Sequence, residues 1–242
     1  MKDGIIIKGI SGFYYVEVGQ DLYECKARGI FRKKGLSPLV GDRVAISIID
    51  EADKKGNIEK IYERKSELVR PPIANVDKVL ITFSVKEPNP NMVLLDRFIV
   101  FSEKENLDIR IILTKVDLDE DGTIVDRIVS DYGRIGYKVI PVSVDTGQGI
   151  DQVRQELEGC ISVFAGQSGV GKSSILNAIE PGFKIDTAEI SQKLGRGKHT
   201  TRHSELYKLG PNAIVADTPG FSSFELTDIE IRMGFAASCV EA

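Results

Sequence analysis

The sequence predicts two folding units: a small all-β barrel at the N-terminus, followed by an α/β domain on a mostly parallel sheet. Three observations support this. Short β-rich runs separated by glycine turns fill residues 1–70, strands alternate with helices from residue 76, and a glycine-rich strand–loop–helix motif stands near residue 166. We therefore expect a barrel over residues 1–70, a second domain over 71–228 and a tail over 229–242.

The N-terminal unit is predicted from about five short strands before residue 70. They are expected at residues 5–7, 13–18, 21–25, 42–49 and 56–61. This pattern is typical of a small barrel, of either the OB-fold class or an SH3-like class. Pro71 and Pro72 follow. Because proline cannot continue a strand ladder or a helix, they predict a stiff connector between the two units.

The second unit begins with residues 79–85, an apolar run that is typical of a strand buried on both faces. Further strands are expected at 110–113, 138–142, 160–164 and 212–216. Helices are expected at 91–106, 122–134, 149–158 and 172–180. This alternation predicts a parallel sheet with helices on both of its faces.

The composition is that of a globular protein. The 242 residues include 32 basic and 36 acidic side chains, for a net charge of −4, and 42% are hydrophobic. The three cysteines are too far apart for a disulfide framework. No apolar run approaches the roughly 20 residues that span a bilayer, and the N-terminal apolar stretch is too short for a signal peptide. We expect a cytoplasmic monomer without a membrane partner.

A phosphate-binding loop is predicted where residues 166–173 fit the pattern G-x-x-x-x-G-K-[ST] between a strand and a helix. Its backbone N–H groups are expected to surround the phosphates. Those groups belong to Gly166, Gln167, Ser168, Gly169, Val170 and Gly171. Lys172 is expected to reach the β- and γ-phosphates, and the Ser173 hydroxyl to coordinate Mg²⁺. The pattern does not distinguish ATP from GTP.

A second phosphate-side motif, Asp-Thr-Pro-Gly at residues 217–220, follows the predicted strand 212–216. A carboxylate at this end of a strand helps to hold Mg²⁺ in P-loop enzymes, so Asp217 is the expected magnesium carboxylate. The Gly220 N–H is expected to meet the γ-phosphate and so to sense it.

Residues 114–117, Thr-Lys-Val-Asp, predict which base is bound. The Asp117 carboxylate can accept hydrogen bonds from the N1–H and the 2-amino group of guanine. Adenine cannot supply them, so a buried Asp117 left unpaired would penalise ATP. The stem of Lys115 is expected to cover the base, with Val116 between the two. Thr114 replaces the usual Asn, and it can still donate to neighbouring backbone.

A second base-side loop is predicted at Ser143 and Val144, where the backbone would contact the guanine O6. Both base-side motifs precede the phosphate loop, whereas ordinary GTPases carry them after it. Because each motif still follows a parallel strand, one sheet can hold all of them, and termini that lie close in space permit such a permutation. We therefore expect a circularly permuted P-loop GTPase domain.

The motifs TKVD, SVD, GQSGVGKSS, GRGKHTTRH and DTPGF occur in this order behind a small barrel. In this the sequence resembles the RsgA family (YjeQ/YloQ type) over roughly residues 5–228. The resemblance implies an OB-fold barrel that contacts ribosomal RNA, and a Mg²⁺-dependent enzyme that converts GTP to GDP. It also implies stimulation by the small (30S) ribosomal subunit and a role in late maturation of that subunit. It adds Ser174 to the phosphate loop, and it places Thr201, or alternatively Thr200, on Mg²⁺.

Phe221 stands where many GTPases have a glutamine that orients the attacking water, which a phenylalanine cannot do. The resemblance implies that the switch I histidine, here His199, does this work. An unperturbed imidazole pKa of about 6.5 suits the role. The alternative is that His199 contacts RNA or solvent. The expected catalytic residues are therefore His199, Lys172 and Thr201.

RNA is expected to contact a basic loop at residues 26–35 of the barrel. Basic side chains and an aromatic ring suit the backbone and the unpaired bases of RNA. The residues are Arg28, Phe31, Arg32, Lys33 and Lys34. The alternative is a solvated basic loop without a partner.

The tail departs from the family pattern, in which a zinc-binding domain with three Cys and one His follows. Residues 229–242 hold one Cys and no His, so we expect no four-ligand Zn²⁺ site in this chain and weaker ribosome docking. Three other outcomes are open. They are an ATP-dependent P-loop kinase, against which Lys115 and Asp117 argue, a nucleotide-switched RNA-binding module without efficient turnover, and an inactive chain.

Overall fold

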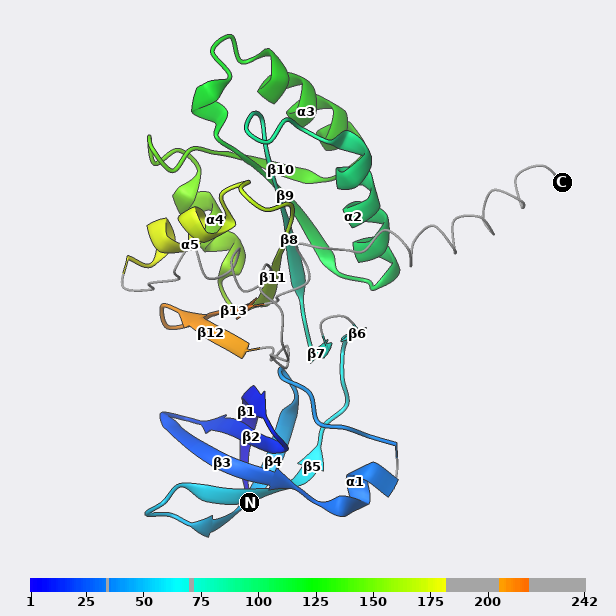
Figure 1. Ribbon diagram of the computed structural model, residues 1–242, viewed down its shortest axis with the longest axis vertical. Helices are drawn as coiled ribbons and strands as arrows, with labels where there is room; N and C mark the ends of the chain where they lie inside the picture. Colours follow the sequence, from blue (N-terminus) through cyan, green and yellow to red (C-terminus); the bar gives the residue numbers. More distant parts are fainter. Residues whose placement is uncertain (34, 70–71, 182–204, 218–242) are drawn as a thin grey trace, which may run out of the picture.

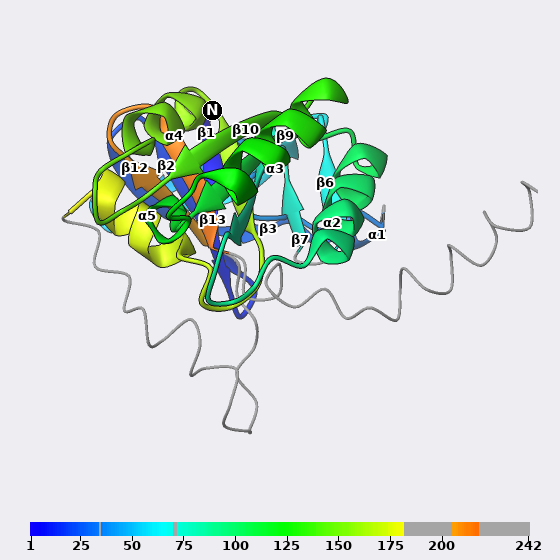
Figure 2. The same ribbon diagram turned by 90° about the horizontal axis from the view of Figure 1, so that it is seen from above.

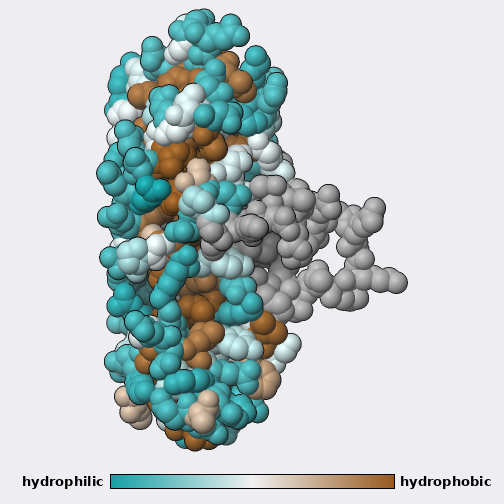
Figure 3. Space-filling model, turned by 90° about the vertical axis from the view of Figure 1, so that its left-hand side faces the viewer, coloured by the Kyte–Doolittle hydropathy of each residue, from teal (hydrophilic) through white to brown (hydrophobic). Residues whose placement is uncertain are grey.

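The computed structural model describes residues 1–33, 35–69, 72–181 and 205–217. Figure 1 shows two parts placed end to end, a β-barrel at the bottom of the view and an α/β domain at the top. The space-filling view in Figure 3 shows the same elongated shape, with polar and apolar side chains interspersed on the face drawn. Within the described ranges, no helix has the length and apolar character that crossing a membrane would need.

Five strands close the barrel in the cyclic order β1-β2-β3-β5-β4-β1, and only β3 and β5 run parallel among these pairs. The strands are β1 (Lys2–Ile10), β2 (Phe13–Val18), β3 (Asp21–Ala27), β4 (Arg43–Asp50) and β5 (Lys55–Ile61). Alternate side chains point inward, and Ile6, Val16, Tyr23, Ile46 and Ile58 are completely buried. This is an OB-like barrel, and the OB-fold prediction is confirmed.

The connector contains structure that the sequence did not predict. Strands β6 (Glu67–Val69) and β7 (Pro72–Ala74) form an antiparallel hairpin, in which Val69 pairs with Pro72. The prediction of a connector without a ladder was wrong because Pro72 is the first residue of its strand, where the missing N–H is tolerated. Ile73 also bridges to Val40, which precedes β4, so the hairpin is joined to the N-terminal part of the chain.

The α/β domain is a layered structure around a parallel sheet in the order β10-β9-β8-β11-β13. Its strands are β8 (Lys78–Ser84), β9 (Asp108–Thr114), β10 (Lys138–Val142), β11 (Ile161–Ala165) and β13 (Ala213–Asp217). Its helices are α2 (Met92–Lys104), α3 (Thr123–Arg134), α4 (Ile150–Leu157) and α5 (Lys172–Ile179). The predicted strands and helices of this domain are confirmed, with ends that differ by a few residues.

Helices cover both faces of this sheet, as Figure 2 shows with α2 and α3 on one side and α4 and α5 on the other. Successive side chains of strand β8 point alternately to the two faces of the sheet. Val79 and Ile81 belong to the apolar cluster that contains the buried residues of α2 and α3, whereas Leu80 belongs to the cluster of α4 and α5. Every residue of β8 is buried, as expected for a central strand.

Strand β12 (Glu205–Leu209) is a further element that the sequence analysis missed. It pairs antiparallel with β13, and at Lys8 and Glu205 it also pairs with β1. The Lys8 ammonium lies 2.8 Å from the Glu205 carboxylate across this seam. Among the described residues, eleven strands therefore form one continuous sheet from the α/β domain into the barrel.

The amino ends of β8, β9 and β10 are tied together by one carboxylate from α4. Glu156 accepts hydrogen bonds from Lys78 at 2.8 Å, from Arg110 at 2.7 Å and from Lys138 at 2.6 Å. Burial alone would raise the pKa of Glu156, but the bonds from Lys138 and Lys78 and the charge of Arg110 outweigh it and lower the pKa to about 2. We call these four residues the Glu156 cluster.

Candidate nucleotide-binding site

The phosphate loop and the two base-side motifs lie at one edge of the sheet. Strands β8, β9, β10, β11 and β13 are parallel, so their carboxyl ends share that edge, and loops start there at residues 85, 115, 143 and 166. Open parallel sheets bind ligands outside the carboxyl ends of their strands. The arrangement therefore brings the phosphate loop and both base-side loops together, although they are far apart in the sequence.

The phosphate loop, residues 166–171, joins β11 to α5. At Gly166 a Cβ atom would lie 2.0 Å from the carbonyl oxygen of Thr82, so only glycine lets this loop pack against β8. Gly171 precedes the helix with a φ of 98°, which again favours glycine. The loop thus enters the amino end of α5, where free N–H groups and the helix dipole favour an anion.

Lys172 is the charged group of this loop. Its ammonium donates to the carbonyl oxygens of Gly166 and Gln167, both at 2.6 Å. Burial lowers the pKa of Lys172 to about 8. An anion brought to this loop would stabilise the charged lysine, which is what a phosphate-binding residue requires.

The residues after Lys172 fit the expected Mg²⁺ chemistry. Ser173 stands in the first turn of α5 and is partly buried, whereas Ser174 is exposed. Mg²⁺ prefers oxygen ligands and is usually held by one or two protein groups together with substrate phosphates. The described residues contain no group of three or more His, Cys, Asp or Glu side chains that could hold a metal by itself. A single hydroxyl beside a phosphate loop fits Mg²⁺ bound in this way.

Thr114 links the guanine motif to the phosphate loop. Its buried hydroxyl donates to the carbonyl oxygen of Val170 at 2.6 Å, and the carbonyl of Phe83 lies 3.3 Å away. The prediction that a threonine here can still donate to neighbouring backbone is confirmed. One hydroxyl therefore fixes the base-side loop relative to the phosphate side.

The next residues place the base-reading side chains. Lys115 has a left-handed backbone with φ of 56°, and a 3₁₀ turn (Val116–Leu118) follows it. Val116 is buried, but Asp117 is exposed. In the chain without nucleotide this carboxylate is therefore open to water. Discrimination against adenine would require the bound base itself to exclude water from this carboxylate.

The second base-side loop is a compact turn after β10. Ser143 is completely buried, its N–H donates to Gln148 at 3.0 Å, and its hydroxyl accepts from the Thr146 N–H at 3.2 Å. Val144 is 39% exposed. The loop thus exposes Val144 at the ligand edge while Ser143 holds its shape.

Several predicted site residues lie outside the described part of the chain. They are His199, Thr200, Thr201 and Gly220. The backbone of Asp217 ends β13 at the expected edge, but its side chain is outside the description as well. The roles assigned to these residues stay predictions.

The predicted RNA loop of the barrel is partly a short helix, α1 (Gly29–Lys33), and not a loop. Phe31 is 7% exposed and packs in the barrel core, so its ring is not available to stack on a base. The basic neighbours of Phe31 suggested an exposed RNA-binding run, but burial of this ring in the apolar core anchors α1. Arg28 pairs with Glu59 at 2.6 Å and Lys33 is exposed, whereas Lys34 and the Arg32 side chain are outside the description.

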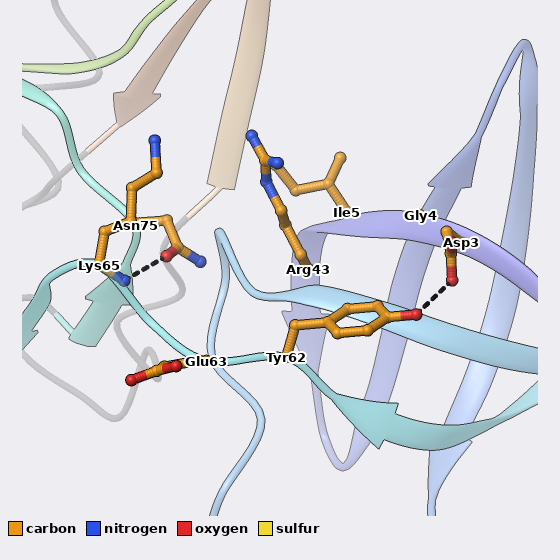
Figure 4. A pocket seen from close by; sticks show the side chains of 8 residues that line it. All are labelled: Asp3, Gly4, Ile5, Arg43, Tyr62, Glu63, Lys65 and Asn75. Carbon is orange, nitrogen blue, oxygen red and sulfur yellow. Dashed lines mark hydrogen bonds between the residues drawn. The ribbon is translucent and has the colours of Figure 1, made fainter.

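A hollow of about 760 Å³ lies where the barrel meets the connector, and none of the residues that line it belongs to a described nucleotide motif (Figure 4). Arg43 and Lys65 line it beside Tyr62, whose hydroxyl donates to Asp3 at 2.7 Å. Its mixed charge and its position do not suit the predicted chemistry, so the nucleotide site is assigned from the motifs and not from the hollow.

No sequence motif marks the loop that follows β8. Since β8 is the central strand and its neighbours β9 and β11 both carry nucleotide motifs, the loop at its carboxyl end must lie among them. Strand order was the signal that could have identified this loop, and a single sequence does not provide it.

Comparison with known proteins gives two family matches. Residues 61–227 match the RsgA GTPase family, and residues 3–58 match the RsgA N-terminal domain. A small ribosomal subunit biogenesis GTPase RsgA of Alkaliphilus metalliredigens is 50% identical over 93% of this chain and 77% of its own length. A protein of the same name from Ruminiclostridium cellulolyticum is 51% identical over 95% of this chain and 75% of its own length.

Two solved structures share the fold. YjeQ from Thermotoga maritima superimposes with a TM-score of 0.78 at 36% identity, covering 91% of this chain and 75% of that one. YloQ, described as a circularly permuted GTPase, superimposes with a TM-score of 0.72 at 42% identity, covering 94% of this chain and 74% of that one.

Proposed function

This chain belongs to the RsgA GTPase family, and from that premise we propose that it hydrolyses GTP in the service of small-subunit (30S) ribosome biogenesis. The observation that carries the proposal is the meeting of the phosphate loop and the guanine motif at one sheet edge, joined by the bond from Thr114 to Val170. Relatives named for this role match over nearly the whole chain.

In the proposed site the phosphates lie on the loop of residues 166–171, with Ser174 at its end. Lys172 turns from the carbonyls of Gly166 and Gln167 toward the β- and γ-phosphates, where an anion offsets the cost of burying its charge. Ser173, Thr201 and Asp217 would hold Mg²⁺, which when bound neutralises charge between the β- and γ-phosphates.

The base is proposed to lie against the stem of Lys115, with Asp117 accepting from the guanine N1–H and 2-amino group. Ser143 and Val144 would bring a backbone N–H to the guanine O6. Thr114 fixes the distance between the base and the phosphates through Val170. In the proposed mechanism the chain accelerates hydrolysis mainly by orienting the reactants. The site orients GTP, and His199 is the group proposed to orient the attacking water.

The partner of the barrel is proposed to be the RNA of the small ribosomal subunit, in the cytoplasm, with the chain acting as a monomer. Arg28, Arg32, Lys33 and Lys34 remain the proposed RNA contacts, without stacking by Phe31. The boundaries at residues 70 and 228 are likewise proposed. Subunit binding would order switch I and so stimulate turnover.

The decisive experiment is steady-state hydrolysis of GTP and of ATP, with and without purified small ribosomal subunits. We expect GTP-selective turnover that rises when subunits are added. GTP turnover that ignores the subunits would remove the ribosomal part of the proposal. A preference for ATP would favour a kinase, and tight GTP binding without turnover, even with subunits, would favour a nucleotide-switched RNA-binding module.

A further inference from the structure

Residues 85–90, Val-Lys-Glu-Pro-Asn-Pro, lie against both nucleotide motifs and join β8 to α2; we call them the 85–90 loop. Figure 2 shows this loop running beside the phosphate loop. Both of its ends are fixed. The Val85 N–H donates to the Thr114 carbonyl at 3.1 Å, and beyond the loop the Asn91 side chain caps α2 through the Leu94 N–H at 3.0 Å.

Ser84 braces the loop from beneath. It is the last residue of β8 and is 1% exposed, and its hydroxyl donates to the carbonyl oxygen of Pro88 at 2.8 Å. This bond crosses the loop, because its acceptor lies four residues further along the chain. A buried hydroxyl with one well-placed acceptor restricts where the middle of the loop can lie.

The middle of the loop in turn holds Lys115. The Lys115 ammonium donates to the carbonyl oxygen of Glu87, the residue before Pro88. Lys115 leaves the strand with a left-handed backbone, so its stem runs from β9 to the 85–90 loop across the ligand edge. The carbon stem is thus fixed at both ends before any base arrives.

The loop also contacts the phosphate side. A Cβ atom added at Gly169 would lie 4.0 Å from the Pro88 ring, at the limit of ordinary van der Waals contact, so the phosphate loop faces the proline at this glycine. Thr114 bonds the adjacent Val170 at 2.6 Å. The 85–90 loop, the guanine motif and the phosphate loop are therefore three walls of one assembly.

We propose that the 85–90 loop is the third wall of the nucleotide site, and that Ser84 is a positioning residue that sets guanine residence time through Pro88, Glu87 and Lys115. The inference rests on the nucleotide site proposed above. A Lys115 stem that is already ordered loses less conformational entropy when the base stacks on it. Without the Ser84 hydroxyl the Pro88 carbonyl loses its donor, and both the loop and the lysine gain freedom.

The test is Ser84→Ala in the full chain, with two kinds of probe. Dissociation constants are measured for fluorescently labelled GDP and for inorganic triphosphate as its competitor. GDP contacts both the base-side loops and the phosphate loop, whereas triphosphate contacts only the phosphate loop. We expect about tenfold weaker GDP binding, from faster dissociation, and triphosphate binding within about twofold of wild type. In steady-state hydrolysis the KM for GTP rises and kcat holds, because the phosphates are not displaced.

The chain offers a matched control in Ser162→Ala. Ser162 is a completely buried serine on the neighbouring strand β11, and its hydroxyl has no hydrogen-bond partner in the described residues. Its removal should leave both affinities unchanged. Ser84→Thr keeps a hydroxyl at the critical position and should recover GDP binding to within about threefold of wild type.

Two results would overturn the inference. Equal GDP affinity for the Ser84→Ala and Ser162→Ala variants would show that the brace does not act on the base. Equal losses of GDP and triphosphate would mean a general disturbance of the site. If the wild-type chain bound GDP no better than ADP, the proposed function would fail together with this inference, and that result is read from the wild type alone.

Discussion

The two edges of the parallel sheet treat positive charge in opposite ways. At the carboxyl edge, the described partners of Lys172 and Lys115 are neutral backbone carbonyls, those of Gly166, Gln167 and Glu87. At the amino edge, Lys78, Arg110 and Lys138 share the carboxylate of Glu156. Positive charge at the amino edge is therefore neutralised by the chain itself, whereas positive charge at the carboxyl edge is available to a ligand.

The pKa directions express the same contrast. Burial lowers the pKa of Lys172 to about 8, because nothing in its described surroundings compensates for the lost water. Burial alone would raise the pKa of Glu156, yet Lys138, Lys78 and Arg110 bring it to about 2. At the carboxyl edge the burial of the charged Lys172 is unfavourable, and a bound polyanion would offset that cost. At the amino edge the ionised Glu156 stabilises the fold through its basic neighbours.

The largest expected effect is at the ligand edge. Lys172→Ala should lower kcat/KM for GTP by about a thousandfold, because it removes a charge aimed at the β- and γ-phosphates. The free energy of unfolding without nucleotide should stay the same or increase, because the substitution removes a buried cation that has no carboxylate partner among the described residues. Hydrolysis assays measure the change in kcat/KM, and urea denaturation measures the free energy of unfolding. A variant that kept its turnover would refute the assignment of Lys172.

The next effect belongs to the opposite edge. Glu156→Gln should lower the free energy of unfolding at pH 7 by about 3 kcal/mol, since the folded pKa of about 2 lies below the reference value of 4.5. A carboxyl with a depressed pKa stabilises the fold above about pH 4.5, and the contribution is lost as the pH falls toward 2.

Urea denaturation at pH 7, 4 and 3 follows this prediction. The gap between wild type and variant should narrow at each step toward acid, while GTP turnover per folded molecule at pH 7 stays within about twofold of wild type. A gap that is constant with pH would mean that the ionised carboxylate is not what ties the three strands together.

A smaller effect separates base recognition from phosphate binding. Asp117→Asn should weaken GDP binding by about a hundredfold, because the amide presents one donor where guanine needs two acceptors. Affinity for inorganic triphosphate should not change. Competition against labelled GDP measures both, with ADP as the control nucleotide. Equal GDP affinities for variant and wild type would place guanine recognition elsewhere.

The smallest effect tests how the Glu156 cluster shares its stability. The Lys138 side chain is 58% exposed, whereas that of Lys78 is 9% exposed. Lys138→Ala should therefore cost no more than about 1 kcal/mol of unfolding free energy, as exposed ion pairs do. A loss as large as that of Glu156→Gln would show that solvent does not screen this pair.

Much of the α/β fold and of the nucleotide site could be predicted from the sequence, because apolar periodicity and the motifs at strand ends are local signals. They located β8 to β11 and the residues around Lys172 and Thr114 correctly. Strand β12 was missed because Glu205 and Lys208 interrupt its apolar pattern, although Gly210, Pro211 and Asn212 form a recognisable turn before β13.

The misses share a physical cause, which is that they depend on tertiary contacts. Phe31 was assigned to RNA from its basic neighbours, but the barrel core buries it. The exposure of Asp117 and the bond from Ser84 to Pro88 depend on how loops fold over one edge. Local sequence does not show which loops pack against one another, so the place of the 85–90 loop beside the nucleotide motifs can be seen only in the structure.

Among the described residues Lys172 has no carboxylate partner, and we expect the phosphate of a bound nucleotide to supply the opposite charge. Proton uptake during binding of a non-hydrolysable GTP analogue tests this directly, by calorimetry in two buffers of different ionisation enthalpy. With a free-state pKa of about 8, raised by the bound phosphates, the chain should take up most of one proton at about pH 8.5 and almost none at about pH 7. Glu156→Gln should behave like wild type. Binding without proton uptake at the higher pH would contradict the account, because Lys172 would then already be charged and paired before the nucleotide arrives.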